Sequence, residues 1–314
     1  MTLLFFLIGK GVSRVKTFLC EYIHEEARKE LASFSEIVDD WEKLSECDAI
    51  INRNLQLTRE VLQEASNLKV IAVHGTGLDG VDLESAKEFG ISVFSTPYRN
   101  AMSVAELNIA LMLMTARKVA MISKQVQENI SFANASVMAK LQGIELSGKK
   151  VAFLGVGEIA KKTIFICKHG FSMECIGWSR SLTKEKADEL GIQFASSRVE
   201  VVKEADFVVL GMALTKETKG IIGKEEIEAM KQGAIVINTA RGALIQEDFL
   251  YEALQQGKLG GAGLDVLIKE PFSVETPLYR LDNVVLTPHI GANTEDALYR
   301  VGMACVQNIC SFIE

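Results

Sequence analysis

Three side chains with complementary chemistry follow apolar segments in the second half of the sequence: Arg241, Glu270 and His289. An arginine offers a planar fork of N–H donors that fits a carboxylate, and a lysine does not reproduce that geometry. A histidine gives a proton to a carbonyl oxygen, or takes one from a hydroxyl, near neutral pH. A carboxylate bonded to the imidazole fixes its tautomer and stabilises its charged form. Taken singly, each residue also fits an ordinary role as a surface charge, a loop acid or a turn histidine. Together they predict the interconversion of a carbonyl and a hydroxyl next to a carboxylate.

A glycine-rich segment follows the apolar run 151–154. It reads Gly155-Val156-Gly157-Glu158-Ile159-Ala160 and continues into a helix-like stretch, which is the context that makes G-x-G-x-x-A a dinucleotide-binding turn. Gly155 permits the tight turn, Gly157 lets the backbone approach a pyrophosphate, and the small Ala160 keeps helix and strand close. Glycines also form such turns without a ligand, but the flanking strand and helix favour a bound dinucleotide.

The residues after the next predicted strand bear on the choice of cofactor. Sequences that bind NAD place an Asp or Glu there, on the ribose hydroxyls, whereas this chain has Ser179-Arg180-Ser181. An arginine can bind a 2′-phosphate through two hydrogen bonds, and a carboxylate would repel it. The sequence therefore favours NADP(H), with NAD(H) as the alternative if Arg180 is a surface charge that stacks on adenine.

The elements that must position these residues alternate along the chain. From about residue 69, short apolar runs without polar alternation are interspersed with amphipathic stretches of helical length, which is typical of βαβ units and a buried parallel sheet. The expected strands include 70–73, 91–94, 151–154, 174–177, 207–210, 234–237 and 284–286, and helices are expected over 83–89 and 104–129. The sequence thus predicts an α/β fold with doubly wound parallel sheets, in which ligands bind at the carboxyl ends of the strands.

Two proline-marked breaks, Thr96-Pro97 and Thr287-Pro288, suggest where the chain passes between domains. If the chain leaves the first domain near 97 and returns near 288, residues 1–97 and 288–314 form a discontinuous substrate domain, closed by a helix over about 294–312. Residues 98–287 then form the dinucleotide-binding domain. A length of 314 residues agrees with two compact units.

Composition excludes several other classes of protein. The formal net charge is −7, with 48% hydrophobic and 24% charged residues, so we expect a soluble globular protein without nucleic acid or membrane as partner. Six cysteines lack C-x-x-C pairs and matching histidine spacing, so no metal site is expected, and free thiols suit a reducing cytoplasm. The run Leu3 to Ile8 is too short for a signal sequence or membrane span and predicts a first buried strand.

The motifs also resemble one known family in order and spacing. NTARGALI, LDVLIKEP and TPHIGA, together with GVGEIA and GTGLDGVDLESAKEFGISV, are similar to motifs of the D-isomer-specific 2-hydroxyacid dehydrogenases over about residues 48–312. The resemblance implies two Rossmann-like domains with a cleft between them, and a homodimer formed through the cofactor domain. It also implies a hydride transfer between a nicotinamide cofactor and a small 2-oxo or 2-hydroxy acid of D configuration, such as phosphoglycerate, glyoxylate or hydroxypyruvate.

Residue roles follow from the resemblance where the motifs match. Arg241 would bind the substrate carboxylate and carbonyl, Glu270 would pair with His289, and His289 would be the acid and base. The amides of a loop in the smaller domain would grip the carboxylate: Gly75, Thr76 and Gly77. The cofactor would contact Gly155, Gly157, Glu158, Ile159, Ser179, Arg180, Met212, Thr239, Ala240, Asp265 and Gly291.

Some residues depart from the family pattern. Ala160 replaces the usual third glycine, Gly211-Met212-Ala213 stands where His-x-Pro is common, and the segment 1–40 matches poorly. A phosphate-bearing substrate would need a further cation, for which Arg53 and Arg99 are candidates, although both also fit as surface charges. The alternative function is an NAD(P)-sensing binding protein of the same fold without turnover, which we would expect to carry an added interaction tail. A formate dehydrogenase would carry Gln in place of Glu270.

Overall fold

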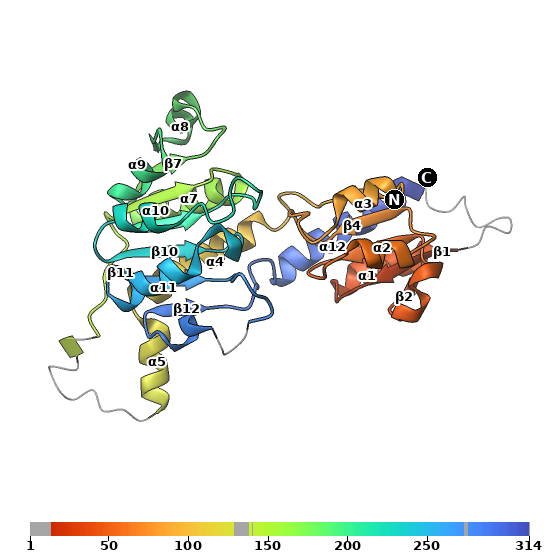
Figure 1. Cartoon of the computed structure of the whole chain (residues 1–314), viewed down its shortest axis with the longest axis horizontal. Helices are drawn as coiled ribbons and strands as arrows, with labels where there is room; N and C mark the ends of the chain where they lie inside the picture. Colours follow the sequence, from red (N-terminus) through yellow and green to blue (C-terminus); the bar gives the residue numbers. More distant parts are fainter. Residues whose placement is uncertain (1–13, 129–137, 140, 273–275, 314) are drawn as a thin grey trace. The chain divides into compact units, whose positions relative to one another are not determined.

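The chain folds into two units, each with its own hydrophobic core. The computed structural model describes the whole chain apart from residues 1–13, 129–137, 140, 273–275 and 314 (Figure 1). Unit 1 comprises Met1–Asn100 and Glu295–Glu314, and unit 2 comprises Ala101–Thr294. The strand expected at Leu3 to Ile8 lies outside the described residues.

Unit 1 is built on a parallel sheet of five strands in the order β2-β1-β3-β4-β5. Its strands are β1 Val15–Leu19, β2 Ser35–Val38, β3 Ala49–Asn52, β4 Val70–Val73 and β5 Ser92–Phe94. Its helices are α1 Glu25–Phe34, α2 Arg59–Glu64, α3 Leu83–Glu88 and α12 Glu295–Ile313, with a 3₁₀ helix η1 at Trp41–Glu46.

Alternate residues of the unit 1 strands build a separate core on each face of the sheet. Ile50 and Ile71 pack with residues of α2 and α3, while Ile51 and Ala72 pack with α1 and α12. The chain therefore returns after unit 2 to cover unit 1, because α12 buries Cys305, Val306 and Ile309 on the same face as α1.

Unit 2 holds a parallel sheet of seven strands in the order β12-β11-β10-β9-β6-β7-β8. Its strands are β6 Lys150–Leu154, β7 Glu174–Trp178, β8 Gln193–Phe194, β9 Phe207–Leu210, β10 Ala234–Asn238, β11 Leu259–Leu264 and β12 Val284–Leu286. The strand order reverses between β6 and β9, which is where doubly wound sheets open a crevice for a dinucleotide. The predicted fold class is confirmed.

Helices cover both faces of this second sheet (Figure 1). One face packs with α4 Ala101–Ala116, α7 Glu158–Phe171 and α8 Lys184–Leu190, and the other with α9 Arg198–Lys203, α10 Lys224–Ala229 and α11 Glu247–Gln255. The remaining elements are α5 Val119–Gln127 and the 3₁₀ helices η2 Gly242–Leu244 and η3 Pro277–Arg280. No helix in the described part of the chain has both the length and the apolar character to cross a membrane.

The single helix expected over 104–129 is wrong: α4 ends at Ala116 and α5 begins at Val119. Lys118 between them has a left-handed backbone with φ of 54°. The carbonyl of Ala116 accepts a hydrogen bond from the amide of Ile144 (2.9 Å) instead of continuing the helical pattern. A contact between residues far apart in the sequence therefore ends the helix, and the apolar pattern of the helix itself gives no sign of this contact.

The boundaries between the two units lie a few residues after the proline-marked breaks. The chain leaves unit 1 after Asn100 and returns to it after Thr294, rather than at 97 and 288. Residues just after Pro288 stay with unit 2, because Ser103 Oγ donates to the carbonyl of Gly291 (2.7 Å) and the amide of His289 donates to the carbonyl of Asp265 (2.8 Å). The division into a substrate and a dinucleotide domain stays a prediction.

Candidate active site

Three adjacent strands of unit 2 end in the residues that the sequence singles out for chemistry. The strands β10, β11 and β12 are neighbours in the sheet, so their carboxyl ends lie along one edge. Arg241 follows β10, Asp265 follows β11, and His289 follows β12. This edge is the usual ligand-binding side of a doubly wound sheet.

Asp265 is fully buried and holds the loop that carries His289. Its Oδ1 accepts hydrogen bonds from Thr287 Oγ1 (2.6 Å) and the amide of Ile290 (2.9 Å), and its Oδ2 accepts one from the amide of Gly291 (2.8 Å). Burial raises the pKa of Asp265, although the three hydrogen bonds favour the charged form. The structure thus gives Asp265 a task in shaping the loop, and its contact with the nicotinamide stays a prediction.

His289 and Glu270 form the central pair of the site. The Nδ1 atom of His289 lies 2.7 Å from Oε2 of Glu270, and because an ionised carboxylate only accepts, Nδ1 donates. Nε2 then remains for proton exchange with another molecule. His289 has a left-handed backbone with φ of 54°, which is uncommon for a residue with a side chain. About a third of each side chain is exposed (34% and 32%), so a small ligand can reach the imidazole.

The loop before Glu270 is fixed by close backbone packing. A Cβ on Gly242 would lie 1.9 Å from the carbonyl carbon of Leu267, so only glycine fits beside this loop. The amide of Ile268 donates to Glu247 Oε1 (2.6 Å), and burial raises the pKa of Glu247. Arg241 immediately precedes Gly242, and these contacts therefore tie the guanidinium-bearing segment to the segment that carries Glu270.

The glycine turn after β6 meets the end of β9. Gly155 has φ of 96°, and a Cβ there would lie 2.6 Å from the carbonyl carbon of Gly211. The amide of Gly155 also donates to the carbonyl of Trp178 at the end of β7 (2.8 Å). Gly155 is therefore needed for close packing, and Met212 lies directly beside the turn.

The next glycine leaves room for a ligand. Gly157 caps α7 at its N-terminus, and a Cβ built on it would have nothing within 4 Å. The first amides of a helix lack partners within the helix, so Glu158 and Ile159 offer donors and a positive dipole end beside this open space. Both features fit the pyrophosphate of a dinucleotide.

A buried asparagine joins the cofactor segments. Asn108 of α4 accepts a hydrogen bond at Oδ1 from Thr239 Oγ1 (2.8 Å) and donates from Nδ2 to Thr163 Oγ1 (3.2 Å). Thr163 Oγ1 donates in turn to the carbonyl of Ile159 (3.0 Å). This series of hydrogen bonds fixes the first turn of α7 relative to Thr239 and the neighbouring Ala240. In the sequence, Asn108 is the single amide side chain of the segment Ala101–Ala116, and that feature alone does not mark it as a site residue.

Ser179 and Arg180 follow β7 next to the glycine turn. Ser179 is partly buried and Arg180 is exposed. Arg180 is near enough to contribute to the lowered pKa of Glu217, whose main cause is a hydrogen bond from Thr215. The cationic side chain of Arg180 thus lies at the strand end where the sequence predicts contacts with the adenosine ribose.

Gly75, Thr76 and Gly77 belong to unit 1, after β4. The carbonyl of Gly75 accepts hydrogen bonds from the amide (2.8 Å) and the Oγ1 (3.1 Å) of Thr96. Among the described residues, the amides of Thr76 and Gly77 have no protein acceptor, so both can donate to an anion. No group of three His, Cys, Asp or Glu side chains that could hold a metal occurs in the described ranges.

Comparison with known proteins identifies the family. Residues 109–291 match the model of the D-isomer specific 2-hydroxyacid dehydrogenase, NAD binding domain. The chain belongs to this family. Its NAD-binding domain indicates a nicotinamide cofactor, and the matched region contains the predicted unit 2 site residues from Gly155 to Gly291.

Similar proteins in this family cover most of the chain. D-3-phosphoglycerate dehydrogenase of Methanocaldococcus jannaschii is 38% identical over 94% of this chain, which spans only 57% of that enzyme. Hydroxypyruvate reductase of Thermotoga maritima is 39% identical over 85% of both chains. A crystal structure of a protein from Thermus thermophilus superposes with a TM-score of 0.85, at 32% identity over 95% of this chain and 97% of that one.

Two glycine substitutions distinguish a packing role from a ligand role in this 2-hydroxyacid dehydrogenase fold. Gly155→Ala introduces both a strained φ and a clash, so we expect it to lower the free energy of unfolding by about 2 kcal/mol or more, measured by urea denaturation. Gly157→Ala should leave that free energy nearly unchanged, yet weaken binding of NADH and NADPH about tenfold, because its methyl group enters the open space. Unchanged nucleotide affinity in Gly157→Ala would argue against pyrophosphate binding there.

Proposed function

We propose that this protein is an NAD(P)-dependent oxidoreductase that transfers a hydride between the nicotinamide and a small 2-oxo or D-2-hydroxy acid. The observation that carries the proposal is the 2.7 Å contact of His289 with Glu270, at the sheet edge that also holds the glycine turn. The bound nicotinamide would supply or accept the hydride. The remaining steps fall to side chains of this chain.

His289 handles the proton in this mechanism. In reduction, Nε2 of the protonated imidazole donates a proton to the carbonyl oxygen, and in oxidation it takes the proton from the hydroxyl. Glu270 keeps Nδ1 protonated and balances the positive charge of the imidazolium, so Nε2 stays directed at the substrate. Arg241 and the amides of Thr76 and Gly77 are proposed to bind the substrate carboxylate.

The proposal is tested with a panel of 2-oxo acids, each offered with NADH and with NADPH, while nicotinamide absorbance is followed. Glyoxylate, hydroxypyruvate and phosphohydroxypyruvate belong in the panel because similar proteins are named for glyoxylate, hydroxypyruvate and phosphoglycerate. Nucleotide binding without turnover of any acid would favour the alternative, a nucleotide-sensing protein of the same fold.

His289→Gln should lower turnover about a hundredfold or more, because glutamine cannot carry the proton. Binding of NADPH and NADH, measured by fluorescence titration, should stay close to that of the unaltered protein. His169→Gln is the matched control, since His169 is an exposed histidine on α7 and should leave turnover intact. Full activity in His289→Gln would remove this histidine from the mechanism.

The proposed cofactor preference is NADP(H). Arg180 supports it, because its exposed guanidinium follows β7 beside the glycine turn, and the carboxylate that would repel a 2′-phosphate is absent at Ser179. Glu217 lies close enough for its charge to interact with Arg180, and it would compete with a phosphate for that cation.

Arg180→Ala should weaken NADPH binding about tenfold or more and NADH binding little, because only NADPH carries the 2′-phosphate. Glu217→Gln should strengthen NADPH binding by removing the competing charge. Arg280→Ala, an exposed arginine on η3, serves as the control. Equal losses for both cofactors in Arg180→Ala would show that Arg180 does not read the phosphate.

Arg53, a cation near the loop 75–77, is relevant to which substrate the protein binds. Arg53 follows β3, the neighbour of β4, and its charge adds to the burial that lowers the pKa of His74 to about 4. His74 is therefore neutral at physiological pH, and Arg53 carries the positive charge at this end of the sheet. We propose Arg53 as a contact for the second anionic group of a substrate such as phosphoglycerate.

We also propose that the protein is a homodimer, in the cytoplasm. The nine-residue helix α5 supports the dimer, because it carries Val119, Met121, Ile122 and Val126 and has no buried residue, so its apolar side is open to a second copy. The six cysteines are free thiols, which agrees with a reducing compartment.

Light scattering coupled to size-exclusion chromatography tests the dimer. The unaltered protein should elute at twice the chain mass of 34.5 kDa, and Ile122→Asp with Val126→Asp should shift it toward the monomer, because charges would be buried in the interface. Lys124→Ala changes an exposed polar position of the same helix and should keep the dimer. A monomeric unaltered protein would refute this interface.

A further inference from the structure

A groove in unit 1 runs between α12 and the segment 95–99. It consists of two adjoining cavities of about 440 Å³ and 480 Å³ that share Arg99, Ala304 and Gln307. Both cavities are lined by unit 1 residues alone. Their volumes lie in the range of sites for small molecules.

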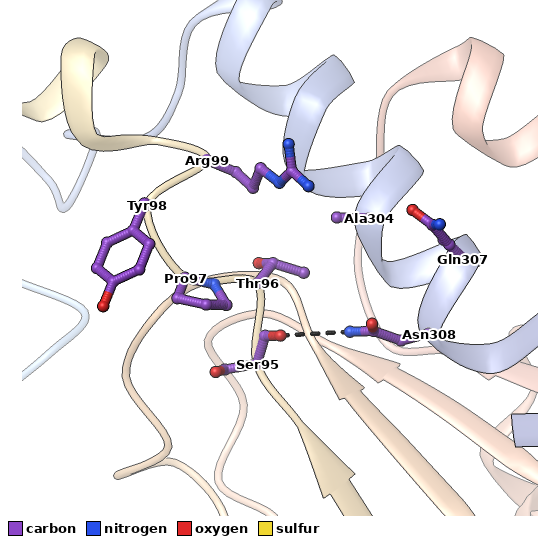
Figure 2. Close-up of a pocket in the computed structure, with 8 residues that line it drawn as sticks. All are labelled: Ser95, Thr96, Pro97, Tyr98, Arg99, Ala304, Gln307 and Asn308. Carbon is purple, nitrogen blue, oxygen red and sulfur yellow. Dashed lines mark hydrogen bonds between the residues drawn. The ribbon is translucent and has the colours of Figure 1, made fainter. Parts of the chain in front are cut away.

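Two arginines, Arg99 and Arg300, line the second cavity of this groove. The Nε atom of Arg300, on α12, donates to the carbonyl oxygen of Arg99 (2.9 Å), which holds the side chain of one arginine against the backbone of the other. Figure 2 shows the side chain of Arg99 extending toward α12, whereas Tyr98 points away from it.

Neither guanidinium forms an ion pair with a carboxylate within the described part of the chain. Elsewhere in the same structure, arginines do find such partners: Arg59 pairs with Glu88 (2.7 Å) and Arg198 with Glu226 (3.1 Å). Among the described residues that line the groove, Glu30 is the carboxylate, and it is exposed and pairs with neither arginine. Two cations thus line one cavity in a protein of net charge −7, an arrangement that an anion would stabilise.

Neutral donors complete the lining. Asn308 donates from Nδ2 to the carbonyl of Ser95 (3.3 Å), which fixes α12 relative to the segment 95–99 (Figure 2). The amide of Gln307 and the hydroxyl of Ser95 also line the first cavity. Guanidinium forks with amide and hydroxyl donors match the several acceptor oxygens of a phosphate group.

We infer that this groove is a second anion site, which binds a small phosphate-bearing molecule through Arg99 and Arg300. The lining of the groove shares no residue with the glycine turn of unit 2 or with the loop Gly75–Gly77, although Thr96 in its first cavity contacts Gly75. The segment 95–99 leads through Asn100 directly into α4, where unit 2 begins. A ligand in the groove would therefore restrain the connection between the units.

Isothermal titration with inorganic phosphate, at constant ionic strength and with saturating NADPH, tests the inference without any turnover. We expect a saturable site whose affinity falls about tenfold or more in Arg99→Ala and in Arg300→Ala, with Arg280→Ala and Arg53→Ala unchanged. Thermal unfolding of each variant checks that it is folded. Arg300→Lys keeps the charge but loses the fork, so it should bind with intermediate affinity.

Two further measurements identify the kind of ligand and test whether phosphate binds at the cofactor site instead. Glycerol 3-phosphate that binds more tightly than inorganic phosphate would indicate a phosphate ester as the ligand, and the reverse order would indicate the free ion. Arg180→Ala should leave phosphate binding intact. Loss of binding in Arg180→Ala, or an unchanged isotherm in Arg99→Ala and Arg300→Ala, would overturn the inference. Since no substrate is converted, these outcomes do not depend on the proposed oxidoreductase activity.

Discussion

The buried carboxylate of Asp265 organises the candidate active site. It accepts hydrogen bonds from Thr287, Ile290 and Gly291, and its backbone carbonyl accepts one from the amide of His289. A charge in a dry interior is costly unless its hydrogen-bonding capacity is satisfied, so the loop and the carboxylate stabilise each other. The hydrogen bonds of this network hold His289 in its left-handed backbone conformation, which is disfavoured for a residue with a side chain. In this conformation the imidazole points to Glu270.

Close backbone packing at two glycines also holds the loops of the candidate site in place. Gly242 lets the segment after β10 lie against the Leu267 backbone, and Gly155 lets the turn after β6 lie against Gly211. Each contact joins the ends of strands that are neighbours, or near neighbours, in the sheet. The reactive side chains and the dinucleotide turn therefore sit on a rigid sheet edge, which is the support that a preorganised site requires.

Both units carry the groups that we propose as anion binders. In unit 2 these are the first amides of α7 and Arg180 for a dinucleotide, and Arg241 for a small acid. In unit 1 they are the amides of Thr76 and Gly77 and the cation Arg53. The protein as a whole is acidic, so it attracts anions only at such local concentrations of donors. Arg99 and Arg300 form another concentration of this kind, on α12 and the segment that leads to α4.

The sequence by itself determined the features that depend on local spacing. Apolar runs between turn residues predicted most strands of unit 2, and the glycine turn, Arg241, Glu270 and His289 were all identifiable from their types and neighbours. The resemblance also implied the pairing of Glu270 with His289, and only the tertiary structure decided how these residues are held in place. The break after Ala116, the network through Asn108 and the role of Asp265 rest on contacts between residues that are tens of positions or more apart. Such contacts leave almost no trace in local periodicity, because they form only when the fold brings distant segments of the chain together.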